Sequence, residues 1–390
     1  MNTPIIGEGN IWIRLPFPDD SSEFTTSSAS VFYNPEMELN RDITVAAISG
    51  FIKRIEVEPA LLSYADVMSA SGIRGIRMAS EVGVKCWLND WDQEAYEIIQ
   101  ENITLNHLEG ICTSSHQNAN TLMHQEQFDI VDLDPFGSPA PFMDAAARSA
   151  RRLLCITATD TAPLCGAHLK SGIRKYAAVP LNTEYHREMG ARILLGVAAR
   201  ALARRDKGMN VLLTHVTRHY VRVYLEIIRG VPFADATMEK MGIISHCFQC
   251  GFRSWEYGLI PEPVSACPNC GKKLKFAGPL WLGTIHDHDF CRIVLDELTY
   301  RKSGKCKDAV KIIEFCRDEV DIPTYYDQHW LCKQNKISAG PIDELVEELI
   351  SAQFRTSRTH FSGTGFKTDA GLDRITKTLH ELDFKRNARR

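Results

Sequence analysis

Short apolar segments alternate with longer helical patterns between about residues 60 and 230 of this chain. Turn-forming residues bound the short segments, and the longer segments have the apolar spacing of helices. Strands that alternate with helices form a parallel sheet that is covered on both faces. We therefore predict a Rossmann-like α/β fold. The predicted strands are residues 63–68, 85–89, 128–133, 152–159 and 211–217, and the predicted helices are residues 73–82, 93–106, 141–150 and 184–205.

The texture of the chain changes after the last predicted strand. Cysteine, glycine and proline become frequent from Ser245, and long helical patterns follow Phe290. A chain of 390 residues is too long for one ordinary core, so two or three domains are expected. We place a boundary near residue 235. This gives an α/β domain over residues 1–235 and a smaller α+β domain over 236–390, with a cysteine-rich module at 245–275.

Composition limits the location and the partners of the protein. The apolar share of 44% suits a globular protein, and no apolar run reaches the ~20 residues that a membrane span needs. The first residues, MNTPIIGEGN, lack the basic start and apolar stretch of a secretion signal. The twelve cysteines then indicate the cytoplasm, where thiols stay reduced or bind metal. The net charge of −4 does not by itself indicate nucleic acid, and nothing indicates a membrane or an obligate protein partner.

A nucleoside site is predicted where successive strands end. The first strand ends in Asp66 and continues into "SASGIRG", whose small residues let a ligand approach the backbone and a helix N-terminus. This loop lacks the G-x-G-x-x-G pattern of dinucleotide sites. Asp90 ends the next strand, where an acid binds ribose hydroxyls. The alternative for Asp90 is a helix N-cap, a role that Asp92 would fill equally well. Asn118 and Ala119 follow a further plausible strand, a weak signal on its own.

The segment "DLDPFGSPAPF" (132–142) follows the strand at 128–133 and carries the chemistry. Asp134 and the Pro135 carbonyl can accept hydrogen bonds from an exocyclic amine and aim its lone pair at an electrophile, while Phe136 stacks on a planar base. With a glycine-poor loop and a ribose acid upstream, this pattern indicates a nucleoside without a pyrophosphate, which S-adenosylmethionine fits. The acid-Pro-aromatic element resembles the signature of S-adenosylmethionine-dependent amino methyltransferases. The alternative is a plain turn, since Asp-Pro and Gly-Ser-Pro are common in turns.

Several ordered segments resemble one known family. They are "VFYNPEMELNRD" (31–42), "ASGIRGIR", "LNDWD", "DLDPFGSPAPF", "TATDTAPLCG", "PLNTEYHREMGARILL", "HYVRVYL" and "RTHFSGTGFKTDA" (358–370). In this order they resemble the tRNA (guanine-N2)-dimethyltransferases, which dimethylate the guanine at tRNA position 26. The resemblance covers most of the chain. It implies an S-adenosylmethionine-dependent methyltransferase domain and a C-terminal domain that binds tRNA.

The resemblance implies three contacts around the methionine part of the cofactor. Arg41 and Arg74 would contact its carboxylate, which suits the paired donors of a guanidinium group. Phe32 would pack near the cofactor. For Arg41 the alternative is a surface salt bridge with Asp42 or Glu38.

The resemblance also implies the contacts of the nucleoside and the amine. Asp90 would hold the ribose, Asn118 and Ala119 would border the adenine, and Asp134 would be the catalytic carboxylate. Asn118 departs from the family, which has aspartate before this alanine. Its amide oxygen can still accept a hydrogen bond from the adenine amine, although without the negative charge.

Two cysteine pairs predict a structural zinc site. The pattern C-x2-C-x16-C-x2-C can close a tetrahedral thiolate site, and a glycine after each pair permits a tight turn. Four protein sulfurs leave no open coordination position, so the zinc would be structural. His246 is an alternative ligand that we expect to be a bystander. The predicted ligands are Cys247, Cys250, Cys267 and Cys270.

The C-terminal segment resembles a winged-helix nucleic-acid binder. An amphipathic helix is predicted from Pro341, and the basic, glycine-containing segment 355–370 predicts a hairpin. Residues 351–390 hold nine Lys and Arg against four Asp and Glu, which favours contact with phosphates. The alternative is a wing that only packs. The predicted tRNA contacts are Arg355, Arg358, His360 and Lys367, with Phe366.

The leading hypothesis is a tRNA methyltransferase that transfers one or two methyl groups to the N2 atom of guanine 26. One alternative is an N-methyltransferase that acts on DNA adenine or on a protein amide. The other is a zinc-containing RNA-binding protein with a vestigial methyltransferase fold.

Overall fold

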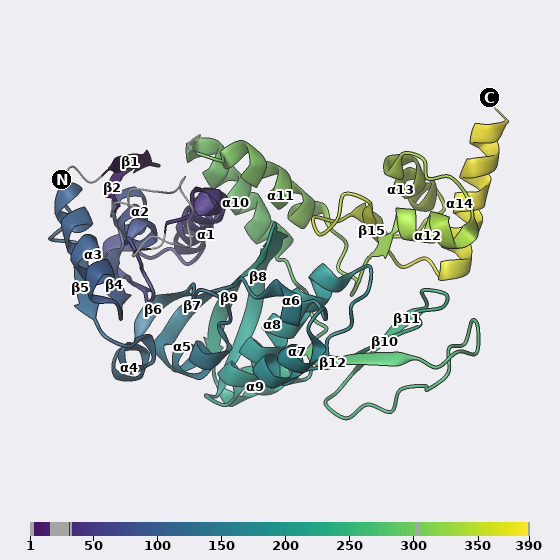
Figure 1. Cartoon of the computed structure of the whole chain (residues 1–390), viewed down its shortest axis with the longest axis horizontal. Coiled ribbons are helices and arrows are strands. Elements are labelled where there is room, and N and C mark those ends of the chain that lie inside the picture. The colour runs from purple at the N-terminus through teal and green to yellow at the C-terminus, as the bar shows by residue number, and fades with distance from the viewer. Residues whose placement is uncertain (1–3, 16–30, 32, 302–303, 389–390) are drawn as a thin grey trace, which may run out of the picture. The chain divides into compact units, whose positions relative to one another are not determined.

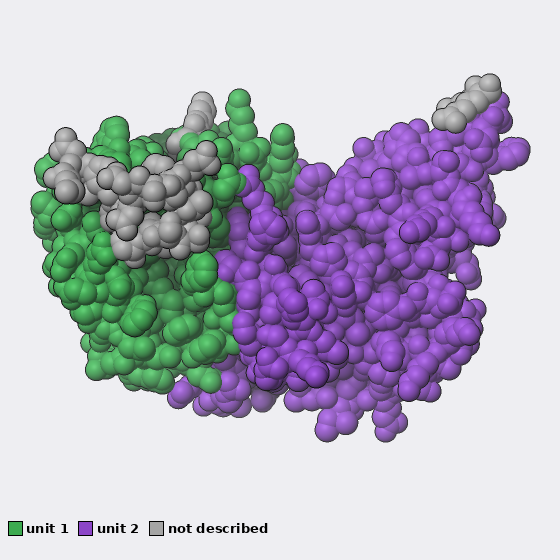
Figure 2. Space-filling view, in the orientation of Figure 1, with its two compact units in different colours: residues 1–158, 222–229, 289–314 green, residues 159–221, 230–288, 315–390 purple. Residues whose placement is uncertain are grey.

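The computed structural model describes residues 4–15, 31, 33–301 and 304–388 of the 390-residue chain (Figure 1). By packing, the chain divides into two compact units that interleave in sequence (Figure 2). Unit 1 comprises Met1–Ala158, Arg222–Arg229 and Asp289–Glu314, and unit 2 comprises Thr159–Val221, Gly230–His288 and Phe315–Arg390. The domain boundary near residue 235 concerns a division in chain order and stays a prediction.

The largest sheet has seven strands in the order β5-β4-β3-β6-β7-β9-β8. The first five of these strands are parallel neighbours. β8 and β9 are separated in the chain by only two residues, too few for a parallel crossover, so the sheet is mixed. The strands are β5 (Cys112–His116), β4 (Lys85–Asp90), β3 (Ser63–Asp66), β6 (Phe128–Leu133), β7 (Ala150–Ala158), β9 (Tyr220–Arg229) and β8 (Lys207–Thr217).

The predicted α/β alternation is confirmed, whereas the expectation of a wholly parallel sheet is wrong at β8 and β9. Helix α2 shows why small residues follow β3. A Cβ atom on Gly75 would lie 2.8 Å from the Leu88 side chain, so glycine lets the helix pack closely on β4. The helices between these strands are α2 (Ile73–Glu81), α3 (Gln93–Leu105), α4 (Ala119–Gln125), α5 (Met143–Ser149), α6 (Thr161–Leu164), α7 (Leu169–Tyr176) and α8 (His186–Ala203).

The N-terminal segment adds a hairpin, β1 (Ile5–Glu8) and β2 (Ile11–Arg14), and helix α1 (Glu38–Arg54). Residues 39–52 of α1 are all buried, including polar ones, so this helix is an interior element. None of the helices in the described part of the chain is long and apolar enough to cross a membrane. Later helices are α9 (Val231–Met238), α10 (His288–Arg301) and α11 (Cys306–Asp318).

Two three-stranded sheets belong to the second half of the chain. One, with the order β11-β10-β12, consists of β10 (Met241–His246), β11 (Arg253–Tyr257) and β12 (Lys275–Trp281). The other, with the order β13-β15-β14, consists of β13 (Tyr326–Asp327), β14 (Thr356–Arg358) and β15 (Gly365–Thr368). The second sheet is accompanied by α12 (Gln328–Asn335), α13 (Ile342–Ser351) and α14 (Leu372–Asn387).

The predicted helix and hairpin of the winged-helix arrangement are confirmed. Pro341 precedes the first residue of α13, and β14 and β15 form an antiparallel hairpin. A separate apolar core that includes Leu345, Leu349 and Phe366 holds the helices and the hairpin together.

Candidate active site and cysteine cluster

The chain reverses its direction of travel across the large sheet between β3 and β6. From β3 it moves outward through β4 to β5, and it then returns to β6 on the other side of β3. In open α/β sheets, ligands bind beyond the carboxyl ends of the strands at such a switch point. β3 ends in Asp66, and β6 leads into Asp134. The predicted site residues therefore gather where the topology favours a ligand.

Asp132, two residues before Asp134, is a structural acid. Its side chain is fully buried, and Arg222 on β9 donates to both of its oxygens, with Nη1–Oδ1 at 2.7 Å and Nη2–Oδ2 at 2.6 Å. Tyr64 donates a further hydrogen bond at 3.1 Å. Burial disfavours the charged form, but Arg222 and then Arg74 outweigh it and lower the pKa of Asp132. The carboxylate of Asp132 is thus neutralised by an internal ion pair.

Asp134 is the partly exposed acid of the pair. Its side chain is 17% exposed, and it accepts a hydrogen bond from Nη2 of Arg74. Arg74 is in turn held by α1, because its Nη1 donates to Asn40 Oδ1 at 2.8 Å and to Thr44 Oγ1 at 3.1 Å. The orientation of Asp134 is therefore set by a buried arginine, while part of its carboxylate remains open to solvent.

Pro135 and Phe136 present the rest of the predicted motif. Pro135 is buried, whereas Phe136 is 88% exposed. Gly137 follows with φ +101°, a backbone conformation that favours glycine and turns the chain after the ring. An exposed ring beside a partly exposed carboxylate can stack on a base while the acid binds its amine.

Asp66 carries a titratable charge at this edge. Burial raises its pKa to about 7, and the neighbouring charges of Asp132 and Asp134 add to the effect, against the opposing guanidinium of Arg74. A second cation near Asp66 would favour the ionised form of its carboxyl group.

Asp90 ties the end of β4 to the loop that follows β3. It accepts hydrogen bonds from the backbone N–H groups of Ala70 at 2.8 Å and of Asp92 at 3.1 Å. Asp92, not Asp90, caps α3, since its side chain accepts from the N–H of Ala95 at 3.0 Å. The N-cap alternative for Asp90 is therefore wrong. Binding of ribose by Asp90 stays a prediction.

Asn118 stands just past the end of β5 and caps α4. Its side-chain oxygen accepts from the N–H of Asn120 at 2.9 Å, and the neighbouring Ala119 is buried. Aspartate would form the same cap, so the family's residue and this one are equivalent in that role. The adenine contact of these two residues stays a prediction.

Arg41 is buried and pairs with Glu8 of the N-terminal hairpin. Its Nε–Oε1 and Nη2–Oε2 distances are 2.6 and 2.5 Å. The alternative of a surface salt bridge with Asp42 or Glu38 is therefore wrong, and the contact with a cofactor carboxylate stays a prediction. Phe32 lies outside the described residues.

Sequence reasoning missed the residues that hold the acids in place, chiefly Arg222, Tyr64 and Asn40. One signal was present. Arg222 interrupts the apolar segment "HYVRVYL", and a charged residue inside such a strand needs a buried partner.

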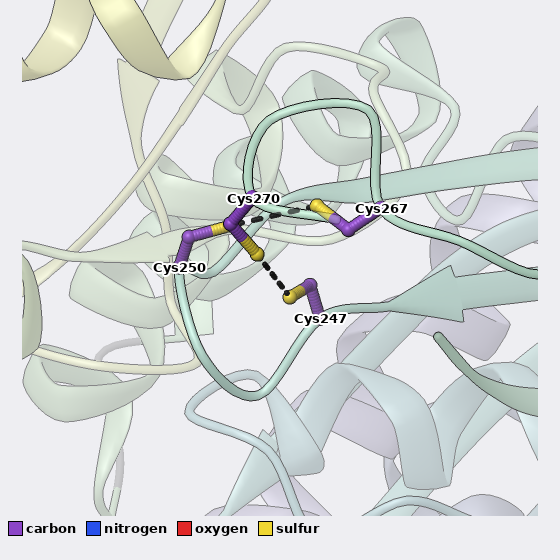
Figure 3. A group of neighbouring side chains, drawn as sticks. All are labelled: Cys247, Cys250, Cys267 and Cys270. Carbon is purple, nitrogen blue, oxygen red and sulfur yellow. Dashed lines mark hydrogen bonds between the residues drawn. The ribbon is translucent and has the colours of Figure 1, made fainter. Parts of the chain in front are cut away.

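The four cysteines of the two predicted pairs lie together (Figure 3). Their sulfur atoms are all within 4.8 Å of one another, and Cys247–Cys270 and Cys250–Cys267 are each 3.5 Å apart. The first pair lies on the turn between β10 and β11, the second just before β12. Each pair is followed by a glycine with positive φ, whose N–H donates to the carbonyl of the first cysteine of that pair. This group could hold a metal ion.

The four predicted tRNA contacts fall into two buried residues and two that remain candidates. The side chains of His360 and Lys367 are only 1% exposed and pair with Glu319, and Lys367 also pairs with Glu188. The expectation that these two contact phosphate is wrong, because burial between carboxylates leaves no room for it. Arg355, 68% exposed and paired with Asp369, stays a candidate. Arg358 also stays one.

Comparison with known proteins gives one consistent result. A family model described as N2,N2-dimethylguanosine tRNA methyltransferase matches residues 13–380. The curated tRNA (guanine(26)-N(2))-dimethyltransferase of Methanosarcina mazei is 53% identical over 97% of this chain and 98% of its own. That of Halobacterium salinarum is 45% identical over 95% and 98%. The solved complex of Trm1 from Pyrococcus horikoshii with S-adenosyl-L-methionine has a TM-score of 0.86 at 36% identity, covering 96% of this chain and 99% of that one.

Proposed function

The chain belongs to the N2,N2-dimethylguanosine tRNA methyltransferase family, and from this premise we propose how its residues carry out the transfer. It is a tRNA (guanine-N2)-dimethyltransferase that uses S-adenosylmethionine, with guanine 26 of tRNA as its target. The observation that carries the proposed mechanism is the contrast at the end of β6. Asp132 is locked to Arg222, while Asp134 is partly exposed at the switch point.

Asp134 acts on the amine of the guanine. The lone pair of an exocyclic amine is delocalised into the ring, so the amine is a weak nucleophile. Asp134 and the Pro135 carbonyl accept its N–H bonds, which orients the lone pair and stabilises the positive charge that develops on nitrogen. The carboxylate then takes the proton that the nitrogen loses. Phe136 holds the base by stacking.

The charges of the site fit S-adenosylmethionine. When bound, the cofactor supplies an electrophilic methyl group on a positively charged sulfur. Asp66 and Asp90 place two carboxylates at this edge, and the pKa of Asp66 is raised, first by burial and then by the charges of Asp132 and Asp134. A cofactor that brings a sulfonium and an ammonium group supplies positive charge that favours the ionised form of Asp66. We propose that Asp90 holds the ribose hydroxyls and that Asn118 and Ala119 border the adenine.

Two arginines take different roles in this proposal. Arg74 positions Asp134, because it is itself fixed by Asn40 and Thr44. If Arg74 bound the cofactor carboxylate, it would give up its hydrogen bond to one of these three residues. Arg41 would reach the same carboxylate only by loosening its contact with Glu8.

We further propose that the cysteine cluster binds Zn²⁺. Four sulfurs within 4.8 Å of one another, on two tight turns, match the ligand type and number of a closed zinc site. Cys247, Cys250, Cys267 and Cys270 would all be ligands, so the ion would hold the β10–β12 sheet and take no part in the transfer. Such thiolates need a reducing compartment, and we place the enzyme in the cytoplasm.

A methyl-transfer assay tests the proposal directly. The purified protein is incubated with methyl-labelled S-adenosylmethionine and unmodified tRNA, and the nucleosides are analysed by mass. Dimethylguanosine is expected, and Asp134→Ala should lower kcat by ~10²–10⁴ with cofactor affinity nearly unchanged. Asp144→Asn, an exposed acid on α5, is the matched control and should keep full activity.

Other outcomes would overturn the proposal. Label in DNA or protein instead of tRNA would mean a different substrate. Binding of tRNA without transfer would mean that the fold is vestigial. Full activity in Asp134→Ala would remove the carboxylate from the mechanism.

A further inference from the structure

A second group of metal-ligating side chains lies in unit 2, apart from the cysteine cluster. His286, Cys316 and His360 each offer a ligand atom, and these three atoms lie within 4.8 Å of one another. They come from separate segments: the loop between β12 and α10, helix α11, and the loop after β14. The set of two imidazoles and one thiolate is one that zinc-like ions accept.

Glu319 lies against both histidines and holds one of them by a hydrogen bond. Its Oε2 accepts from Nδ1 of His360 at 3.0 Å, and its Oε1 lies 3.7 Å from Nε2 of His286. A carboxylate that holds one nitrogen of an imidazole leaves the lone pair of the other nitrogen available to a metal. For His360 the available atom is then Nε2. Either ring nitrogen of His286 can serve as the ligand atom, because its Nε2 lies beyond hydrogen-bond distance of Glu319.

Three ring nitrogens of the two histidines are buried and unsatisfied. Among the described residues, Nε2 of His360 and both ring nitrogens of His286 have no hydrogen-bond partner. The side chains are only 1% and 3% exposed, and Cys316 is fully buried. A buried polar atom without a partner destabilises the fold, so three of them at one place point to something that the protein binds there.

Glu319 is itself held firmly, as the outer partner of a metal site should be. Oγ1 of Thr359 donates to it at 2.8 Å, and Nζ of Lys367 lies 2.8 Å from its other oxygen. Lys367 also pairs with Glu188, which accepts from Arg192 at 2.8 Å. The carboxylate is thus anchored by β15 and, through Glu188, by α8.

We propose that His286, Cys316 and His360 bind a second zinc-like divalent ion, with Glu319 as the outer carboxylate that orients the imidazole of His360 and lies close to that of His286. The burial of the three side chains keeps substrate away, so the ion is structural. The ion would join the loop before α10, helix α11 and the loop between β14 and β15. The inference does not depend on the proposed methyl transfer.

Metal analysis of the full chain separates this site from the cysteine cluster. After removal of loosely bound ions, the wild type should hold about two zinc ions per chain, one in each site. Cys316→Ala should hold about one, as should the double variant Cys247→Ser/Cys250→Ser, whose remaining ion reports the new site alone. Cys332→Ala is the matched control, since Cys332 is a buried cysteine of unit 2 outside both groups, and it should hold as much metal as the wild type.

Cobalt provides a second measurement, which reports directly on a thiolate ligand. In the Cys247→Ser/Cys250→Ser background, Co²⁺ should give a thiolate-to-cobalt charge-transfer band that is lost when His286→Gln or His360→Gln is added. Equal metal content in the wild type and Cys316→Ala would overturn the proposal. The absence of bound Co²⁺ from the double variant would also overturn it, and a buried water would then be the partner of the unsatisfied histidine nitrogens.

Discussion

At the scale of single residues, the site assigns opposite tasks to two carboxylates two positions apart. Asp132 and Asp134 share one segment and one chemical type, but Arg222 neutralises the first and Arg74 orients the second. An internal ion pair maintains the fold, whereas a partly exposed one can exchange partners with a ligand. The functions of the two acids are therefore set by their cations and not by the acids themselves.

Asp132→Asn should destabilise the fold. It would leave Arg222 buried without its charge partner, a loss of about 3–5 kcal/mol when one member of a buried pair is removed. Asp134→Asn should change stability by much less. Denaturant unfolding of both variants measures the difference, and equal losses would mean that the two acids have the same role.

Asp66 predicts two opposite dependences on pH. Its folded pKa of about 7 lies above the ordinary value of 3.8, so the folded state keeps a proton that the unfolded state has lost. Its contribution to stability is then present below about pH 4 and is lost as pH rises through 7. Cofactor affinity should change in the other direction, since the cofactor's cations favour the ionised carboxylate. Asp66→Asn should flatten both profiles, measured by thermal unfolding and calorimetric titration. A profile of affinity that stays the same in Asp66→Asn would place this residue outside the site.

At the scale of elements, the strands that were predictable from the sequence are those buried on both faces of the large sheet. β3, β4 and β6 are short and mostly buried, and they lie where the sequence predicted strands. β5 was recognised only as a plausible strand end, because "CTSSH" is a polar edge strand with little apolar signal. β9 was missed because Arg222 breaks its apolar run, and the charge is explained only by Asp132 on β6. Long-range pairing of this kind leaves almost no trace in a local pattern.

The same limit explains the wing. The helix and hairpin were predictable from periodicity and glycine, but the side on which Lys367 lies was not. Its buried pairing depends on Glu188 and Glu319, far away in the chain.

The zinc module should behave as a stabilising element only. Cys250→Ser removes one of four ligands and should lower zinc affinity by more than ~10–100-fold, the loss from disturbing an outer partner alone. The melting temperature should fall, while kcat per folded molecule stays close to that of the wild type. Full zinc occupancy in Cys250→Ser, measured against Cys332→Ala, would show that the cluster is not the metal site.

At the scale of the whole molecule, the net charge of −4 gives no general attraction for a polyanion. Binding of tRNA must therefore depend on a limited number of local cations. The packing units interleave along the chain, so residues that lie far apart in sequence belong to the same unit. A cut at any position between residues 160 and 313 would leave parts of both units on each side of it.

The salt dependence of tRNA affinity measures those local contacts. Replacing exposed Arg355 with glutamine should reduce the slope of log Kd against log salt by about one, the value for one lost phosphate contact. Lys367→Gln is the comparison. Because its side chain is buried, it should lower stability and leave the slope unchanged. If the slope fell in Lys367→Gln and stayed unchanged in Arg355→Gln, Lys367 and not Arg355 would be the phosphate contact.

The Arg74–Asp134 pair has a consequence for the number of turnovers on one guanine. The amine begins with two hydrogens and loses one at each transfer, so the dimethylated product has no N–H left for Asp134. If Asp134 binds the amine as proposed, its carboxylate then pairs with Arg74 again, and we expect the dimethylated nucleotide to be released while the monomethylated one is retained. Dimethylated tRNA should accordingly bind more weakly than monomethylated tRNA, and competition binding with the two would measure the gap. In Arg74→Met the difference in affinity between the two tRNAs should become smaller, because no arginine would pair with Asp134 once the guanine amine has lost its last hydrogen.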